Sequence, residues 1–396
     1  MKMKFFKKIF LFLFFAFSID LFPVSSPTTT NALESLLRDD IGDGRLDGLS
    51  GMEAAFILSG IREQDELDTA MAWYRNLVET IRAFHFDPFD RTGSANKVFS
   101  YLHGTWLKQY EKETISLLDI VHKKKFNCVT ATILYNMICE DFGWRTEAFE
   151  TPTHVYTIFT NFTNPVMVEN TTPMGFDIVK NLRAYSNYLA QFYPQSEVLE
   201  IGLDKIYLYE NSRGREINNT ELLGLLVYNR AFFAEKNRDY DLAYRFVRLA
   251  QKFNPDSRSN EKFEIGLYFK WGKQSADQGN NYDAFQVYDE ACGRHPNIPE
   301  FCHNKRTAFF KSAVQSWTEK DWSMAYPLFD RMMDSEFSSG DEYIRIKKYL
   351  KNWAIYFVQQ HKKKEIGEVA ALLEYLDPQD PFLIDLKNRL KSSTEE

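Results

Sequence analysis

Apolar residues recur at the three- and four-residue spacing of helices through most of the chain beyond Leu33. Pro88 and Gly93 interrupt this pattern, as residues that break helices do. A further helix begins at Cys128, where Asn127 has the type of side chain that caps a helix start, and Gly143 ends it. The earlier predicted helical segments are Met52 to Leu58, Leu67 to Phe84 and Ala95 to Tyr110.

The pattern changes to strand-like alternation between Thr153 and Thr160, which puts His154, Tyr156 and Ile158 on one face. The turn-forming run Asn161-Phe162-Thr163-Asn164 follows, and Pro165 to Glu169 is the predicted return strand. A hairpin centred between Asn161 and Phe162 would place His154 directly opposite Glu169.

Small and apolar residues recur every 41 positions in the C-terminal half. Each unit has a small residue, another twelve positions later, a small or apolar residue seven later, and proline five later in three of four units. Small residues are needed where two helices cross closely, and proline ends a helix. The pattern resembles the tetratricopeptide repeat, lengthened by insertion, and predicts a helical solenoid from about Glu221. The four sets are Ala231, Gly272, Ala313 and Ala354; Ala243, Ala284, Ala325 and Ile366; Ala250, Ala291, Met332 and Leu373; and Pro255, Pro296, Phe337 and Pro378.

Composition sets the broad class of the protein. A chain of 396 residues favours two domains, and 44% hydrophobic residues with 34 phenylalanines exclude a disordered chain. The net charge of −7 and the shortness of the basic run His122-Lys123-Lys124-Lys125 argue against a nucleic-acid partner.

The N-terminus has the layout of a secretory signal peptide, with four lysines in its first eight residues and an apolar run from Ile9 to Phe17. Cleavage is expected after Ser18 or after Ser26, and the alternative is an uncleaved anchor reaching Val24. We therefore expect an exported protein, periplasmic or extracellular, whose only membrane contact would be an uncleaved leader.

The four cysteines fall into two groups. Cys128 and Cys139 lie on one predicted helix, about 16 Å apart at 1.5 Å per residue, which is too far for a disulfide. Cys292 and Cys302 flank a proline-containing loop, where they either pair or remain two buried free thiols.

Cys128, His154 and Glu169 together have the residue types of a cysteine-nucleophile site. The helix dipole and the lysines at 123–125 favour the thiolate, and a carboxylate opposite His154 would orient the imidazole. Taken singly, Cys128 could be a packed thiol, His154 a structural histidine and Glu169 a surface charge.

No metal or organic cofactor is expected. One cysteine, one histidine and one glutamate make a poor zinc set, and the run from Asp39 to Gly44 lacks the ligands of a calcium loop because Ile41 and Ser50 occupy ligand positions.

The order of cysteine at a helix start, histidine on a strand and an acid on the next strand resembles the transglutaminase-like superfamily. The resemblance implies that Cys128 is the nucleophile, His154 the base and Glu169 the orienting acid, on a central helix packed against a small antiparallel sheet. Many members carry Asp in the third place, so Glu169 is a departure with a longer reach. More narrowly, the sequence looks like the bacterial branch that joins this core to tetratricopeptide repeats. The segments that carry this likeness are Asn127-Cys128-Val129-Thr130-Ala131-Thr132, Glu150-Thr151-Pro152-Thr153-His154-Val155 and Glu169-Asn170-Thr171-Thr172 with Gly175.

The sequence thus predicts an α+β, mostly helical protein in three parts: a leader at residues 1–26, a transglutaminase-like (papain-like) domain with an N-terminal helical region at 31–220, and tetratricopeptide-like repeats at 221–396. The predicted function is that of an exported cysteine-dependent enzyme acting on amide bonds of proteins or peptides through a thioester, as a peptidase, deamidase or transglutaminase, with the repeats recruiting a protein or peptide. The alternative is a non-catalytic binding or scaffold protein of the cell envelope, since the superfamily also contains inactive binders. A structural envelope protein held by an uncleaved leader is a third possibility.

Overall fold

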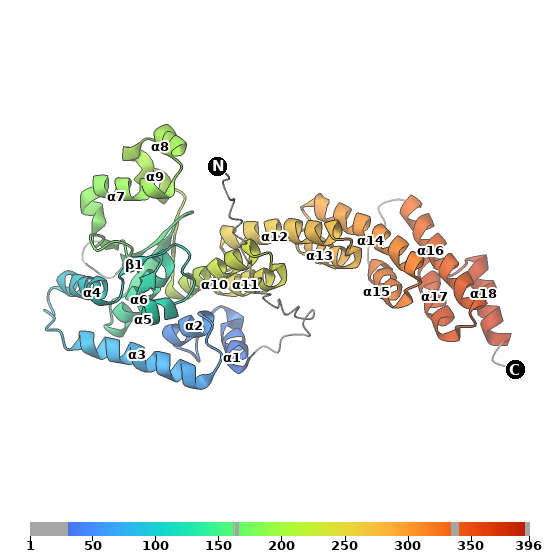
Figure 1. Cartoon of the computed structure of the whole chain (residues 1–396), viewed down its shortest axis with the longest axis horizontal. Helices are drawn as coiled ribbons and strands as arrows, with labels where there is room; N and C mark the ends of the chain where they lie inside the picture. Colours follow the sequence, from blue (N-terminus) through green and yellow to red (C-terminus); the bar gives the residue numbers. More distant parts are fainter. Residues whose placement is uncertain (1–30, 161, 163–165, 334–339, 393–396) are drawn as a thin grey trace, which may run out of the picture.

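The computed structural model describes residues 31–160, 162, 166–333 and 340–392. It is mostly helical with a small antiparallel sheet, and it is elongated, with helix pairs extending from a sheet-containing end (Figure 1). The predicted leader at 1–26 lies outside the described residues. In the part of the chain that the structure describes, no helix is long and apolar enough to cross a membrane.

Five α-helices precede the central helix of the site and share its hydrophobic core. The predicted helix from Ala95 to Tyr110 is wrong at its C-terminal end, because the helix stops at Thr105. The backbone N–H groups of Lys108 and Gln109 instead donate to the carbonyl of Lys124, which draws the chain into a short parallel strand pair. The elements of this region are α1 (Ala32–Asp40), η1 (Ile41–Asp43), α2 (Gly51–Leu58), α3 (Gln64–Arg82), α4 (Arg91–Thr105), β1 (Gln109–Tyr110), α5 (Leu118–Lys123) and β2 (Lys125–Phe126).

Helix α6 (Cys128–Asp141) is the centre of the main hydrophobic core. Every side chain from Val129 to Cys139 is buried, because the sheet, α2 and α10 surround the helix. The helix ends at Phe142, and Gly143 follows with a left-handed backbone (φ 70°), as the sequence predicts.

The four-stranded sheet has the order β5-β4-β3-β6, and all neighbours are antiparallel. Thr157 pairs with Val168, so the hairpin register is displaced by two residues from the predicted one, and His154 is not directly opposite Glu169. An even displacement preserves the face on which each side chain lies. Of the predicted turn, only Phe162 lies within the described residues. The strands are β3 (Thr146–Glu150), β4 (Val155–Phe159), β5 (Val166–Val168) and β6 (Arg215–Ile217).

The two faces of the sheet meet different partners. Val155, Phe159 and Val168 belong to the main core with α6, whereas Tyr156 and Met167 belong to a smaller cluster. That cluster is formed with residues 178–211, which we call the arm, visible in green beside the sheet in Figure 1. The arm contains η2 (Ile178–Asn181), α7 (Leu182–Leu189), η3 (Ala190–Phe192), α8 (Gln195–Ile201), η4 (Leu203–Lys205) and α9 (Ile206–Asn211).

The 41-residue recurrence corresponds to four successive helix pairs. Ala231, Gly272, Ala313 and Ala354 are buried in the first helix of each pair. The second helices bury the next two sets, and Pro255, Pro296 and Pro378 follow their ends, whereas Phe337 lies outside the described residues. The helices are α10 (Asn219–Lys236), α11 (Tyr240–Phe253), α12 (Arg258–Asp277), α13 (Asn281–Arg294), α14 (Pro299–Glu319), α15 (Trp322–Met333), α16 (Gly340–Gln359), α17 (Lys363–Leu376) and α18 (Pro381–Ser392).

The first helix pair also belongs to the core of the sheet-containing end. Leu222 and Leu226 of α10, with Leu249 and Phe253 of α11, lie in the same hydrophobic cluster as α6. The core therefore crosses residue 220, and the first helix pair joins the remaining pairs to the end that carries the site.

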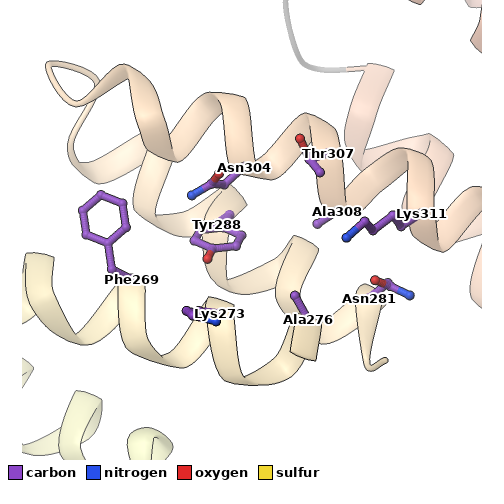
Figure 2. Close-up of a pocket in the computed structure, with 9 residues that line it drawn as sticks. All are labelled: Phe269, Lys273, Ala276, Asn281, Tyr288, Asn304, Thr307, Ala308 and Lys311. Carbon is purple, nitrogen blue, oxygen red and sulfur yellow. The ribbon is translucent and has the colours of Figure 1, made fainter. Parts of the chain in front are cut away.

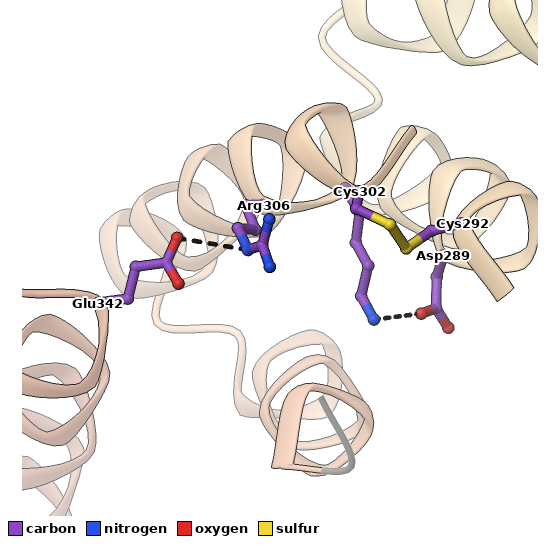
Figure 3. The surroundings of a disulfide bond; sticks show 6 residues. Asp289, Cys292, Cys302, Arg306 and Glu342 are labelled. Carbon is purple, nitrogen blue, oxygen red and sulfur yellow. Dashed lines mark ion pairs between the residues drawn. A yellow bond between two sulfur atoms is a disulfide. The ribbon is translucent and has the colours of Figure 1, made fainter. Parts of the chain in front are cut away.

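A disulfide joins Cys292 of α13 to Cys302 of α14, with Cα atoms 4.9 Å apart (Figure 3). Of the two predicted alternatives, the structure has the paired cysteines. The ion pair between Asp289 and Lys305 joins the same two helices, and Arg306 contacts Glu342 of α16 at 3.5 Å. These cross-links hold successive helix pairs together.

Candidate active site

Cys128 is the first residue of α6, and its side chain is partly exposed. Asn127 caps the helix: its side chain accepts from the Thr130 N–H at 2.9 Å, and the Thr130 hydroxyl accepts from the Asn127 N–H at 3.0 Å. The Asn127 amide also donates to the carbonyl of Thr114 at 2.6 Å. This cap fixes the thiol at the positive end of the helix dipole, where negative charge is stabilised.

His154 lies immediately before β4, and its imidazole is almost completely shielded from solvent. Its Nε2 atom is 2.6 Å from Oε2 of Glu169. The predicted meeting of these two residues is therefore present, although they meet diagonally across the hairpin and not as direct partners. Diagonal neighbours on a sheet are within reach of long side chains, which suits glutamate at position 169.

Glu169 follows β5, and a tight turn fixes its backbone. The Glu169 N–H donates to the carbonyl of Gly175 at 2.9 Å. A Cβ atom at Gly175 would lie 1.9 Å from the Glu169 carbonyl oxygen, so this close approach requires glycine. Oε1 of Glu169 accepts hydrogen bonds from the N–H and the hydroxyl of Thr171, leaving Oε2 for His154.

The surroundings of His154 favour the imidazolium. Burial by itself would lower the pKa of His154, but the Glu169 carboxylate and the Cys128 sulfur, through charge and hydrogen bonding, raise it well above the ordinary value of 6.5. Because Nε2 faces Glu169, Nδ1 is the nitrogen available to Cys128; it is buried and makes no well-aligned hydrogen bond. Such bonds often tighten only when substrate binds.

A second histidine near the site is neutral. Burial lowers the pKa of His103 to about 4, against smaller opposing effects from the Asn170 carbonyl and Glu169. At neutral pH His103 therefore adds no positive charge beside Glu169, which leaves His154 as the group that balances the carboxylate.

Aromatic side chains that the sequence analysis missed enclose the imidazole. Phe192 stacks on His154 with ring centroids 5.4 Å apart, and Tyr188 approaches edge-on at 6.1 Å. The Tyr188 hydroxyl also bonds to the hydroxyl of Thr171. Both aromatic residues come from the arm, and nothing local in the sequence indicates that residues 188–192 fold back over position 154.

Tyr110 lies on the thiol side of the site. Its ring packs edge-on against Phe126, two residues before Cys128, with centroids 5.9 Å apart. Burial raises the pKa of the Tyr110 hydroxyl, and the charges of Cys128 and Glu169 raise it further, so the hydroxyl stays protonated and able to donate.

A buried polar network fixes helix α6 against the hairpin. The Asn170 amide donates to the hydroxyls of Thr132 at 3.2 Å and Thr157 at 2.8 Å, and Thr157 donates to Asn136. Asn136 in turn donates to Asn219 of α10 at 2.7 Å. The network sets the distance between the helix that carries the thiol and the strands that carry His154 and Glu169.

Among the described residues, no group of three or more histidine, cysteine, aspartate or glutamate side chains is arranged to hold an ion. Cys128, His154 and Glu169 bring together the residue types that nucleophilic sites use.

A separate pocket of about 380 Å³ lies between α12, α13 and α14 (Figure 2). Lys273 and Lys311 bring positive charge to it, and Asn304 adds an amide. The pocket has both apolar walls and hydrogen-bonding groups, and it is lined by Phe269, Lys273, Ala276, Asn281, Tyr288, Asn304, Thr307, Ala308 and Lys311.

No model of a known protein family matches the chain, and no curated protein matches it significantly. Function is therefore inferred from the geometry and chemistry of the residues.

Proposed function

We propose that this protein is a cysteine-dependent acyl-transfer enzyme in which Cys128 is the nucleophile, His154 the base and Glu169 the group that orients the base. The observation that carries the proposal is the buried 2.6 Å contact between His154 Nε2 and Glu169 Oε2, with the Cys128 sulfur close enough to the imidazole to raise its pKa. A merely structural histidine would not need both a carboxylate on Nε2 and a thiol near enough to raise the pKa of its imidazole.

The proposed reaction begins with attack of the Cys128 thiolate on an amide carbonyl carbon. The carbonyl oxygen takes up the electron pair, and the N–H of Cys128 is suited to stabilise it because first-turn amides lack partners within the helix. The C–N bond then breaks, the imidazolium of His154 gives its proton to the departing nitrogen, and a thioester remains. Water or an amine, deprotonated by His154, releases the acyl group and restores the thiol.

We also propose a fold family for each part of the chain. A thiol-bearing helix packed on an antiparallel sheet, with histidine before one strand and an acid after the next, supports a transglutaminase-like core. The helix pairs, with buried small residues every 41 positions, support a tetratricopeptide-like solenoid.

We assign the helix pairs to recruiting a protein or peptide. The pocket of Figure 2 supports this role, because it combines apolar walls with two lysines and two amides, which suit an acidic polypeptide segment. Lys273 contacts Asp277 at 2.6 Å, whereas Lys311 lies across the pocket on α14, so the second lysine is the better candidate for contact with a ligand.

We also propose that the protein is exported. The Cys292–Cys302 disulfide supports this location, since stable disulfides are typical of oxidising compartments. N-terminal sequencing of the protein recovered from outside the cytoplasm tests it, and an intact Met1 would favour an uncleaved anchor.

The activity can be tested with a mixture of glutamine-containing peptides, with and without an added primary amine, followed by mass spectrometry. Peptide cleavage, deamidation or amine incorporation that is lost in Cys128→Ala would support the enzyme, with Cys139→Ala as the matched control. If wild type and Cys128→Ala give the same products and no thioester forms on Cys128, the non-catalytic binding protein is the better description.

A further inference from the structure

We infer that Glu210, at the far end of the arm, is a positioning residue that holds the turn carrying His154. The inference rests on the proposed function of Cys128, His154 and Glu169. Glu210 lies 56 positions beyond His154 in the sequence, and its hydrogen bonds go to Thr151 and Thr153. It acts through the threonines of the turn.

The contacts run directly from Glu210 to the His154 backbone. Oε1 of Glu210 accepts from the Thr153 hydroxyl at 2.7 Å, from the Thr153 N–H at 3.4 Å, and from the Thr151 hydroxyl. The Thr151 hydroxyl in turn accepts from the His154 N–H at 3.0 Å, and the Thr151 N–H donates to the His154 carbonyl at 2.8 Å. One carboxylate oxygen therefore organises the whole turn from Thr151 to His154.

The Glu210 carboxylate is buried with few polar partners. The residue is fully buried, and among the described residues its carboxylate has no ion-pair partner. Its second oxygen, Oε2, is buried without a hydrogen-bond partner. Burying a carboxylate without a cation beside it is costly, and the hydrogen bonds from Thr151 and Thr153 are what offset that cost. What they fix is the backbone beside His154.

The arm holds both partners of the buried pair. Glu210 holds the His154 turn, Tyr188 bonds to Thr171 beside Glu169, and Phe192 stacks on the imidazole. Movement of the arm would thus shift the base and its orienting acid together. Of these three contacts, only the one made by Glu210 acts on the backbone next to His154.

The experiment compares the pH dependence of Cys128 alkylation by iodoacetamide in the full chain of wild type, Glu210→Ala and Glu210→Gln. The groups that face His154 are Glu169, Cys128 and Tyr188, none of which changes in these variants. Glu210→Ala should reduce the neutral-pH rate by about tenfold and move the profile toward that of His154→Ala, because a misplaced base no longer stabilises the thiolate. Glu210→Gln keeps an acceptor oxygen and should retain most of the wild-type profile.

Glu264→Ala is the matched control. Glu264 is an equally buried carboxylate in α12, bound to Arg294 and His295 far from the thiol. It should lower the thermal midpoint and leave the alkylation profile unchanged. If Glu210→Ala does the same, Glu210 is only structural and the inference is wrong.

Two further variants keep the inference testable if Glu210→Ala does not fold. Thr153→Val removes one donor at an exposed position and should shift the profile in the same direction by less. Thr151→Val removes the hydroxyl that links Glu210 to the His154 N–H, and it should move the profile in the same direction by more than Thr153→Val does. An unchanged profile in both threonine variants contradicts the inference. If His154→Ala itself leaves the profile unchanged, the proposed triad fails first.

Discussion

Nε2 of His154 lies 2.6 Å from Oε2 of Glu169, and both side chains are shielded from solvent. The strand pairing makes them diagonal neighbours across the hairpin. Diagonal neighbours are farther apart than directly opposite residues, and the long side chain of glutamate spans that distance. With Thr171 holding the other carboxylate oxygen, the contact fixes the imidazole and leaves Nδ1 for the thiol.

The first prediction concerns the two free thiols. Cys128 should react readily with iodoacetamide at neutral pH, because it is partly exposed and lies at a capped helix start beside the His154 imidazole. Cys139 should stay unmodified in the folded protein, since burial raises its pKa well above the ordinary value and blocks access. Peptide mapping after alkylation at several pH values measures both.

The same assay tests the partners of Cys128. His154→Ala should move the alkylation profile to higher pH, and Glu169→Gln should do so less, because the amide keeps the shape of the carboxylate without its charge. Profiles identical to wild type in both variants would remove the basis for the triad. Circular dichroism of each variant controls for unfolding.

The second prediction concerns stability and pH. The folded-state pKa of His154 is raised, so the His154–Glu169 pair contributes fully below the unfolded-state pKa, near 6.5, and its contribution is lost as pH rises through the folded-state value. Urea unfolding across the alkaline range should show a steeper fall in the free energy of unfolding for wild type than for His154→Gln. Parallel curves would contradict the raised pKa.

The third prediction concerns the helix crossings. A Cβ atom at Gly272 would lie 2.4 Å from the ring of Tyr288, so Gly272→Ala should cost about 1–3 kcal/mol by overpacking. Gly266→Ala, in the same helix but with open space around the new methyl group, should stabilise by up to about 1 kcal/mol. Chemical denaturation of both variants measures the difference, and equal effects would refute the packing at α12 and α13.

The fourth prediction concerns the disulfide. Thiol titration of the unfolded, unreduced protein should find only Cys128 and Cys139, and reduction should release Cys292 and Cys302. Replacing both paired cysteines by alanine should cost about 2–4 kcal/mol, because the unfolded chain regains the freedom that the cross-link removed. Four reactive thiols without reduction would show that the pair is not formed in the isolated protein.

The sequence by itself determined the features that local chemistry specifies. Helix α6 begins at Cys128 because Asn127 caps it and ends before Gly143, and the 41-residue recurrence predicts the helix pairs because small residues must occur where helices cross. Alternation also predicted the face shared by His154 and Glu169, since an even error in register leaves faces unchanged.

Only the tertiary structure decided the rest. The register of the hairpin depends on the length of its loop. The alternating strand pattern does not determine that length, so the predicted register differs from the observed one by two residues. The contributions of Tyr188, Phe192 and Glu210 depend on the arm folding back over β4, a long-range contact with no periodic signal in the sequence. The pairing of Cys292 with Cys302 was likewise decided by how α13 and α14 pack, because spacing alone allowed both bonded and free thiols.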